Sequence, residues 1–229
     1  MKKLLMGNTV SEKCINKLKD MGYDIVLLPP FSKLQKDVCT HADMLVFYNG
    51  EELLTHNDYY KENIELFDGL GIKIITTDEN ISPDYPNDIL FNAVLTNDKT
   101  LYAKCAHVSI KIKELANTVI DVKQGYTACS TCKVANNAFM TTDTGLCKAY
   151  MQNDIDVLLV EKEGIELQGY DCGFIGGASA VFDDKVVFFG SLQGYKDGEK
   201  VRKFVEKYGK KAVELSDEKL TDIGGCIAL

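Results

Sequence analysis

One order of hydrophobic and polar segments recurs along the chain. Five times, a stretch with helical periodicity is followed by a Gly or Asn turn and a short apolar strand candidate. In the last helical stretch the apolar residues follow the i, i+3, i+4, i+7 spacing, which predicts an amphipathic helix with one buried face. The strand candidates that end the five units cover 22–28, 71–76, 117–122, 153–160 and 209–215.

Two more strand candidates precede the helical stretch in every unit after the first. The turns between the two carry residues that tolerate tight geometry, such as Asn49-Gly50 and Asp183-Asp184. Each unit therefore has the order strand, strand, helix, strand. The first members of these pairs cover 43–48, 88–92, 126–134 and 174–182, and the second members cover 52–54, 100–103, 138–141 and 185–189.

The first unit lacks its first strand, because residues 1–6 lead directly into a helix near Ser11. The segment 223–229 is an apolar strand that belongs to no other unit. Joining the two chain ends gives five complete units, so we expect a single domain over 1–229 with an α/β fold, a five-bladed propeller of ββαβ units closed by the C-terminal strand. The alternative is a doubly wound open sheet, but its parallel strands would be single strands between helices.

The composition of the chain argues against some classes of binding partner. The chain has 229 residues, and its 26 basic against 34 acidic side chains give a net charge of −8. Nucleic acids and anionic membranes need a basic surface, so we expect neither as a partner. Eight dispersed cysteines predict reduced thiols and a cytoplasmic location. We expect no cofactor, and assembly into a homo-oligomer is left open.

In a closed ring the first strand of each unit would line the central axis, with alternate side chains pointing inward. In the last strand the small residues Gly224 and Ala228 flank Cys226, which leaves room for a ligand. The corresponding residues of the third and fourth units include Asp88, Asn92, Thr127 and Cys129. We therefore predict an axial pocket for a small molecule, lined by Asp88, Asn92, Thr127, Cys129 and Cys226.

Three short segments carry a resemblance to a known superfamily. They are 88–91 (DILF), 169–179 (GYDCGFIGGAS) and 220–226 (LTDIGGC). Together with the five-unit order, they resemble the pentein fold of guanidino-group-modifying enzymes, which include dimethylarginine dimethylaminohydrolase, arginine and agmatine deiminases, and amidinotransferases. The second and third segments are most similar to a bacterial family of unknown function with this fold.

The resemblance also implies roles for single residues. It places the nucleophilic cysteine at Cys226 and the acid that holds the guanidinium at Asp88. The histidine that shuttles protons follows a Gly-x pair, but after Gly125-Tyr126 this chain has Thr127. A thiol with a pKa near 8.5 needs a nearby base or cation to react at pH 7, and threonine supplies neither. His41 is the remaining candidate for a base, although it does not match the motif.

Two other motifs have weaker functional interpretations. Cys129 and Cys132 have the C-x-x-C spacing of metal sites, but positions i and i+3 of a strand point to opposite faces. We therefore expect no metal. The glycine-rich segment 173–177 lacks the Lys-Ser/Thr of a phosphate-binding P-loop. Its glycines predict close approach of the backbone to a ligand or a neighbouring strand.

Three hypotheses on function follow. The chain binds a small guanidino or amidino compound without the usual catalytic histidine, which is the preferred hypothesis. Alternatively, it is a Cys-dependent hydrolase or amidinotransferase of such compounds, with Cys226 as nucleophile, Asp88 as cation anchor and a non-standard base such as His41. A third hypothesis is a scaffold that acts only through its outer helices, with no ligand. Buried, unreactive cysteines are common, so Cys226 also has a purely structural interpretation.

Overall fold

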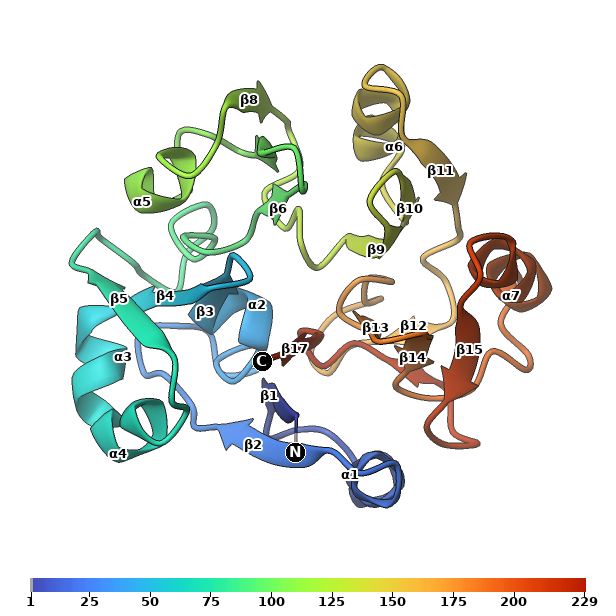
Figure 1. Ribbon diagram of the computed structural model, residues 1–229, viewed down its shortest axis with the longest axis horizontal. Helices are drawn as coiled ribbons and strands as arrows, with labels where there is room; N and C mark the ends of the chain where they lie inside the picture. The colour runs from blue at the N-terminus through green and yellow to red at the C-terminus, as the bar shows by residue number, and fades with distance from the viewer. Residues whose placement is uncertain (1) are drawn as a thin grey trace.

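The structure, a computed structural model, describes residues 2–229. It has a mixed α/β fold in which five three-stranded sheets follow one another around the centre of the molecule (Figure 1). In all five, the middle strand is antiparallel to the inner strand and parallel to the outer one. The five inner strands are β17 (Cys226–Ala228), β3 (Val46–Tyr48), β6 (Val94–Leu95), β9 (Thr131–Ala135) and β13 (Ser179–Phe182).

The middle and outer strands agree closely with the sequence prediction, because their apolar runs are bounded by clear turn residues. The middle strands are β1 (Lys3–Gly7), β4 (Glu52–His56), β7 (Thr100–Ala103), β10 (Ala138–Thr141) and β14 (Lys185–Phe188). The outer strands are β2 (Asp24–Leu28), β5 (Lys73–Thr77), β8 (Thr118–Asp121), β11 (Asp156–Leu159) and β15 (Lys211–Glu214).

The two ends of the described chain meet in one sheet. Strand β17 pairs antiparallel with β1 and places Cys226 opposite Met6. The amide of Leu229 also donates to the carbonyl of Lys3 at 2.9 Å. The predicted completion of the first unit by the C-terminal strand is therefore confirmed.

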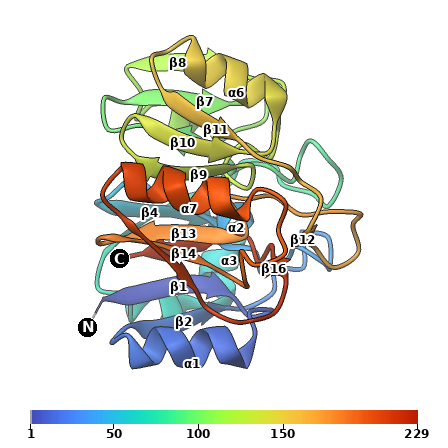
Figure 2. The same cartoon turned by 90° about the vertical axis from the view of Figure 1, so that its right-hand side faces the viewer.

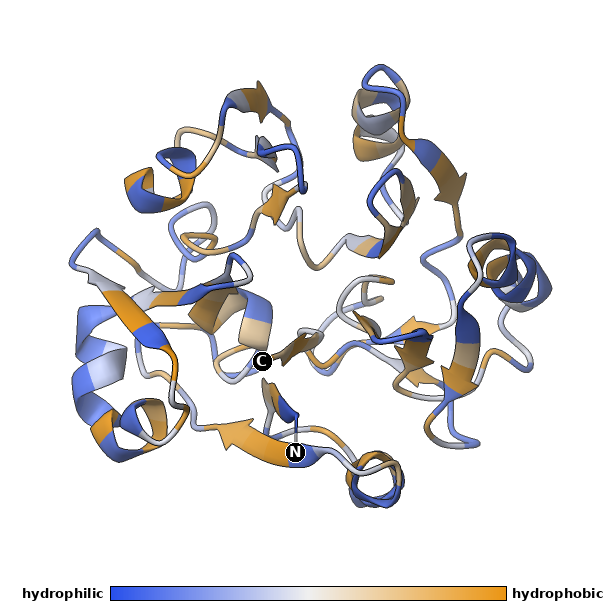
Figure 3. Ribbon diagram, in the orientation of Figure 1, coloured by the Kyte–Doolittle hydropathy of each residue, from blue (hydrophilic) through white to orange (hydrophobic). Residues whose placement is uncertain are grey.

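Helices connect each middle strand to its outer strand. They carry hydrophilic residues on the outside (Figure 3), while Leu18 of α1 and Val201 of α7 are buried against the sheets. None of the described helices is long and apolar enough to cross a membrane. The connecting helices are α1 (Glu12–Asp20), α3 (Asn57–Glu62), α4 (Ile64–Asp68), α5 (Ile110–Lys113), α6 (Thr144–Met151) and α7 (Gly198–Lys207).

The inner strands begin later than the sequence predicts. Residues 88–92 form a turn, with the Asn92 amide bonded to the Ile89 carbonyl at 3.0 Å, and residues 126–130 form another, with Ser130 bonded to Tyr126 at 3.0 Å. Before β3, residues Ala42–Leu45 form the short helix α2. The predicted alternation of side chains over 126–134 is thus wrong, and Thr127 and Cys129 belong to a turn.

These turns lie at one end of the molecule, on the side where the short parallel strands β12 (Ile165–Glu166) and β16 (Leu220–Thr221) pair (Figure 2). The hairpin turns between inner and middle strands lie at the other end. The inner strands β3, β6, β9 and β13 therefore each run toward a hairpin at that end.

Candidate functional site

A cavity of about 820 Å³ occupies the space between the sheets. All five inner strands contribute to its wall, as the sequence predicts for an axial pocket. At one end, which we call the Asp43 end, the wall includes Asp43, Gly176 and Gly224. At the other end, which we call the turn end, it includes residues of the hairpin turns between inner and middle strands, such as Gly50 and Asn136. The turns formed by residues 88–92 and 126–130 are not part of the turn end.

Asp43 is the acidic residue of the cavity wall. It lies in α2, and its amide donates to the Gly224 carbonyl at 3.2 Å. Its side chain is hydrogen-bonded to Cys129, but the buried atom Oδ1 has no partner within the described chain. Burial, followed by the nearby Asp222, raises the pKa of the Asp43 carboxyl well above its usual value.

Asn92 and Cys129 are buried neighbours of Asp43. The Asn92 Nδ2 donates to the Cys129 Sγ at 3.1 Å and to the Asp43 carbonyl at 3.3 Å. Its Oδ1 accepts from the Ala128 amide at 2.7 Å, and the whole residue is inaccessible to solvent. Burial and the neighbouring Asp43 raise the pKa of the Cys129 thiol, which is therefore protonated at neutral pH. The structure thus brings together two of the predicted site residues.

Asp222 and His41 form the adjoining part of this buried polar cluster. Asp222 accepts hydrogen bonds from the amides of Phe174 and Gly224, both at 2.9 Å, yet burial raises its pKa to about 6. The His41 Nδ1 lies 3.9 Å from the Asp222 Oδ1, and burial lowers the pKa of His41 to about 4. His41 is therefore neutral at pH 7, and it is not among the residues that line the cavity.

Glycines make room for this cluster. A Cβ atom on Gly177 would lie 1.8 Å from the Asp222 Oδ1. A Cβ atom on Gly224, where φ is +74°, would lie 2.3 Å from the His41 Cβ. The glycine-rich segment 173–177 therefore approaches both the Asp222 side chain, at Gly177, and neighbouring backbone, since a Cβ atom on Gly176 would lie 2.3 Å from the Ala128 carbonyl oxygen.

Cys226 lines the cavity at the start of β17 and is half-buried. Burial alone raises the pKa of its thiol, so no charged group activates it.

Asp88 and Thr127 are buried but are not among the residues that line the cavity. The Tyr126 hydroxyl donates to the Asp88 Oδ2 at 2.7 Å, while the buried Oδ1 of Asp88 has no partner in residues 2–229. The Thr127 hydroxyl donates to the Gln124 carbonyl at 2.7 Å and stabilises the turn. Of the five predicted pocket residues, only Cys226 lines this cavity.

The sequence prediction missed Asp43 as a site residue. Asp43 and Asp88 stand at the start of the inner segments of consecutive units, and that repeated position was the available signal.

The model of a family of unknown function, DUF6873, matches residues 5–227. No curated protein matches the sequence.

Solved structures that are similar include the Pseudomonas aeruginosa dimethylarginine dimethylaminohydrolase in complex with citrulline (TM-score 0.58, 12% identity, covering 100% of this chain and 99% of that one). The C. jejuni agmatine deiminase is also similar (TM-score 0.60, 8% identity, coverage 99% and 92%). So is an amidinotransferase of the saxitoxin biosynthetic pathway from Microseira wollei (TM-score 0.56, 10% identity, coverage 94% and 88%). The chain thus has the pentein fold of these guanidino-modifying enzymes.

Proposed function

The chain belongs to the family of unknown function DUF6873, and from this premise and its pentein fold we propose that it binds a small guanidino or amidino compound in the central cavity. The cationic group contacts Asp43, and Asn92 and Cys129 hold that carboxyl in position. No chemical step on the ligand is part of this proposal.

The observation that carries the proposal is the unpartnered Oδ1 of Asp43 in the wall of a large cavity. Leaving a buried polar atom without a partner costs roughly 1–3 kcal/mol, which a ligand N–H group would recover. A guanidinium or amidinium presents planar N–H donors that match a carboxylate. Such a cation also favours the ionised form of Asp43, so its binding releases a proton.

The five similar sheets support a wider architectural proposal. We infer that they are the blades of a five-bladed α/β propeller, completed where β17 pairs with β1. The cavity would then be the axial channel of the propeller, to which every blade contributes its inner strand.

Three features favour binding over Cys-dependent hydrolysis. Burial raises the pKa of the Cys226 thiol and thus lowers the thiolate fraction. His41 is a weak base because burial lowers its pKa to about 4. Thr127, which replaces the histidine of the related enzymes, uses its hydroxyl within its own turn.

Isothermal titration with agmatine tests the proposal. We expect the wild type to bind agmatine with release of a proton, seen as a dependence of the measured enthalpy on the ionisation enthalpy of the buffer. Asp43→Asn should weaken binding by about tenfold or more and abolish the proton release, since a charge-assisted hydrogen bond is worth about 1.5–3 kcal/mol.

Asp88→Asn is the matched control, because Asp88 also has an unpartnered buried oxygen but lies outside the cavity wall. It should leave agmatine affinity unchanged. Loss of binding in Asp88→Asn but not in Asp43→Asn would move the cation to Asp88 and refute the assignment to Asp43.

Product analysis tests the catalytic alternative. Incubation with arginine, agmatine and methylarginines should yield no ammonia and no citrulline-type product. Product that is formed by the wild type and lost in Cys226→Ala would overturn the binding-only proposal.

A further inference from the structure

The turn end of the cavity concentrates positive charge in an acidic protein. The charged residues of the cavity wall are three lysines, Lys99, Lys133 and Lys210, and one carboxylate, Asp43. The chain as a whole has a net charge of −8. The excess of cations is therefore a local property of the cavity and runs against the overall charge.

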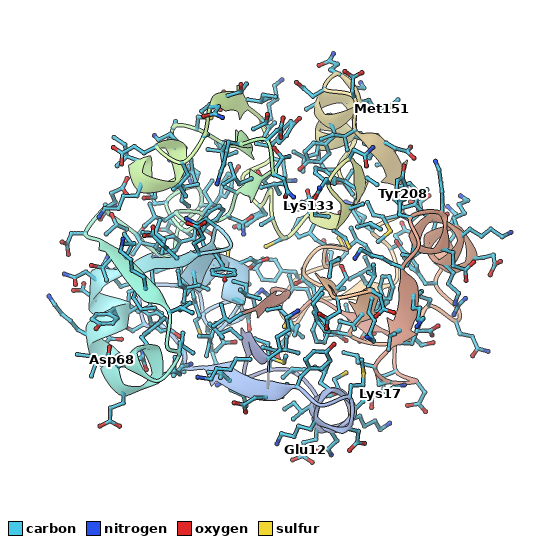
Figure 4. All side chains as sticks on the ribbon, viewed as in Figure 1. Glu12, Lys17, Asp68, Lys133, Met151 and Tyr208 are labelled. Atoms are coloured by element: carbon cyan, nitrogen blue, oxygen red, sulfur yellow. The ribbon has the colours of Figure 1, made fainter. Side chains whose placement is uncertain are left out.

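Lys133 is the best placed of the three lysines. It lies on the inner strand β9 and is half-buried, and Figure 4 shows it toward the centre of the molecule, whereas Glu12 and Asp68 lie at the periphery. Its Nζ donates to the Leu95 carbonyl at 3.1 Å and to the Asn97 Oδ1 at 3.3 Å. An ammonium group has three donors, so one remains for a ligand.

No carboxylate within residues 2–229 forms an ion pair with these three lysines, although many lysines on the outside, such as Lys73 and Lys207, have one. Lys210 donates to the Asp183 carbonyl at 2.8 Å, and Lys99 lies in the turn between β6 and β7. Burial lowers the pKa of Lys133, while Asp98 acts on it in the opposite direction. Within residues 2–229 the three lysines are thus left without an ion pair, and Asp98 is the acid that acts on Lys133.

We propose that the turn end of the cavity is a binding site for a small anion of the carboxylate or phosphate type. Lys133 supplies the main hydrogen bond, and Lys99 and Lys210 add attraction. A half-buried ammonium binds an anion more strongly than an exposed one, because solvent screens it less. This inference rests on the proposed function, because both treat the cavity as a ligand site. It concerns the turn end and an anion, whereas the proposed function concerns the Asp43 end and a cation.

Isothermal titration with glutarate and with inorganic phosphate, at matched ionic strength in potassium chloride, tests this site. We expect at least one of them to bind the wild type, and the comparison shows whether a carboxylate or a phosphate is preferred. Lys133→Met should weaken that binding by about tenfold or more, and Lys133→Arg should retain most of it.

Lys3→Met is the matched control. Lys3 is also half-buried and donates to the backbone carbonyls of Gly69 and Leu70, but it lies outside the cavity wall. This variant should bind the anion as the wild type does. Circular dichroism and thermal unfolding confirm that the variants are folded.

Two outcomes would overturn the anion site. One is the absence of binding by both glutarate and phosphate, and the other is equal binding by the wild type and Lys133→Met. Asp43→Asn separates this inference from the proposed function, because it should lose agmatine but keep the anion. Loss of anion binding in Asp43→Asn, with retention in Lys133→Met, would also contradict the site.

Discussion

The two ends of the cavity carry ionisable groups of opposite type, carboxyl groups at the Asp43 end and lysines at the turn end. At the Asp43 end, two carboxyl groups and a thiol are buried together. Burial raises the pKa values of Asp43, Asp222 and Cys129 and favours their neutral forms. At the turn end the charged residues of the wall are the half-buried lysines Lys99, Lys133 and Lys210. The comparison teaches that burial favours the neutral form at both ends, which protonates the acids at the Asp43 end and lowers the pKa of Lys133 at the turn end.

Packing differs between the two ends as much as protonation, and glycine substitutions should reveal it. In Gly177→Ala the new methyl group would collide with the Asp222 carboxylate at 1.8 Å, so we expect a loss of stability of more than about 3 kcal/mol, or no soluble protein.

At the turn end, a Cβ atom on Gly50 meets nothing within 4 Å, although its φ of +101° strains any side chain. Gly50→Ala should therefore cost only about 1–2 kcal/mol. Urea unfolding of both variants measures the difference, and a similar loss in the two would show that the Asp43 end is no more tightly packed than the turn end.

The raised pKa of Asp222 gives the Asp43 end a characteristic pH dependence. The carboxyl has a pKa of about 6 in the folded protein and about 3.9 when unfolded, so the folded state retains a proton that the unfolded state loses between these values. The stabilising effect of this proton is complete below pH 4 and is lost as the pH rises through 6.

Relative to Asp222→Asn, the stability of the wild type should therefore fall by about 2 kcal/mol between pH 4 and pH 7. Using the difference between the two proteins cancels the titration of other groups. Chemical unfolding across this pH range measures it, and parallel curves for the two proteins would rule out a raised pKa at Asp222.

Alanine substitution of one asparagine at each end compares the two ends again, and we expect smaller losses of stability than from Gly177→Ala. Asn92→Ala leaves the buried amide of Ala128 without its acceptor, and we expect a loss of about 2 kcal/mol. Asn97→Ala removes an exposed acceptor of Lys133 and should cost less than about 0.5 kcal/mol. Thermal unfolding of the pair is the measurement, and equal losses would contradict the contrast between the ends.

The sequence allowed the middle and outer strands to be predicted, because alternating apolar residues there end at clear turn signals. The segments before the inner strands were mispredicted for a physical reason. Residues such as Ile89, Leu90 and Phe91 are apolar because they are buried at the centre of the molecule, and a short buried apolar run has the same composition in a turn as in a strand.

The candidate site was predictable in part for the same reason. Asn92 and Cys129 were selected and do lie in contact, but the expected alternation along a strand placed Asp88 and Thr127 beside them. The repeated position of Asp43 and Asp88 was a local signal for Asp43, but Lys133 had none, because its significance depends on partners from other sheets. Only the fold shows that, within residues 2–229, the Asp43 Oδ1 has no hydrogen-bond partner and Lys133 forms no ion pair.

The pairing of β1 with β17 has a consequence for the order of folding. Four of the five three-stranded sheets join strands that are near neighbours in sequence, so their contacts form over short loops. The fifth three-stranded sheet must bring Met6 against Cys226 and so closes the longest loop in the described chain, at the largest entropic cost before any contact compensates for it. The local sheets should accordingly gain protection from hydrogen exchange early during refolding, and the wall that carries Cys226 should gain it last.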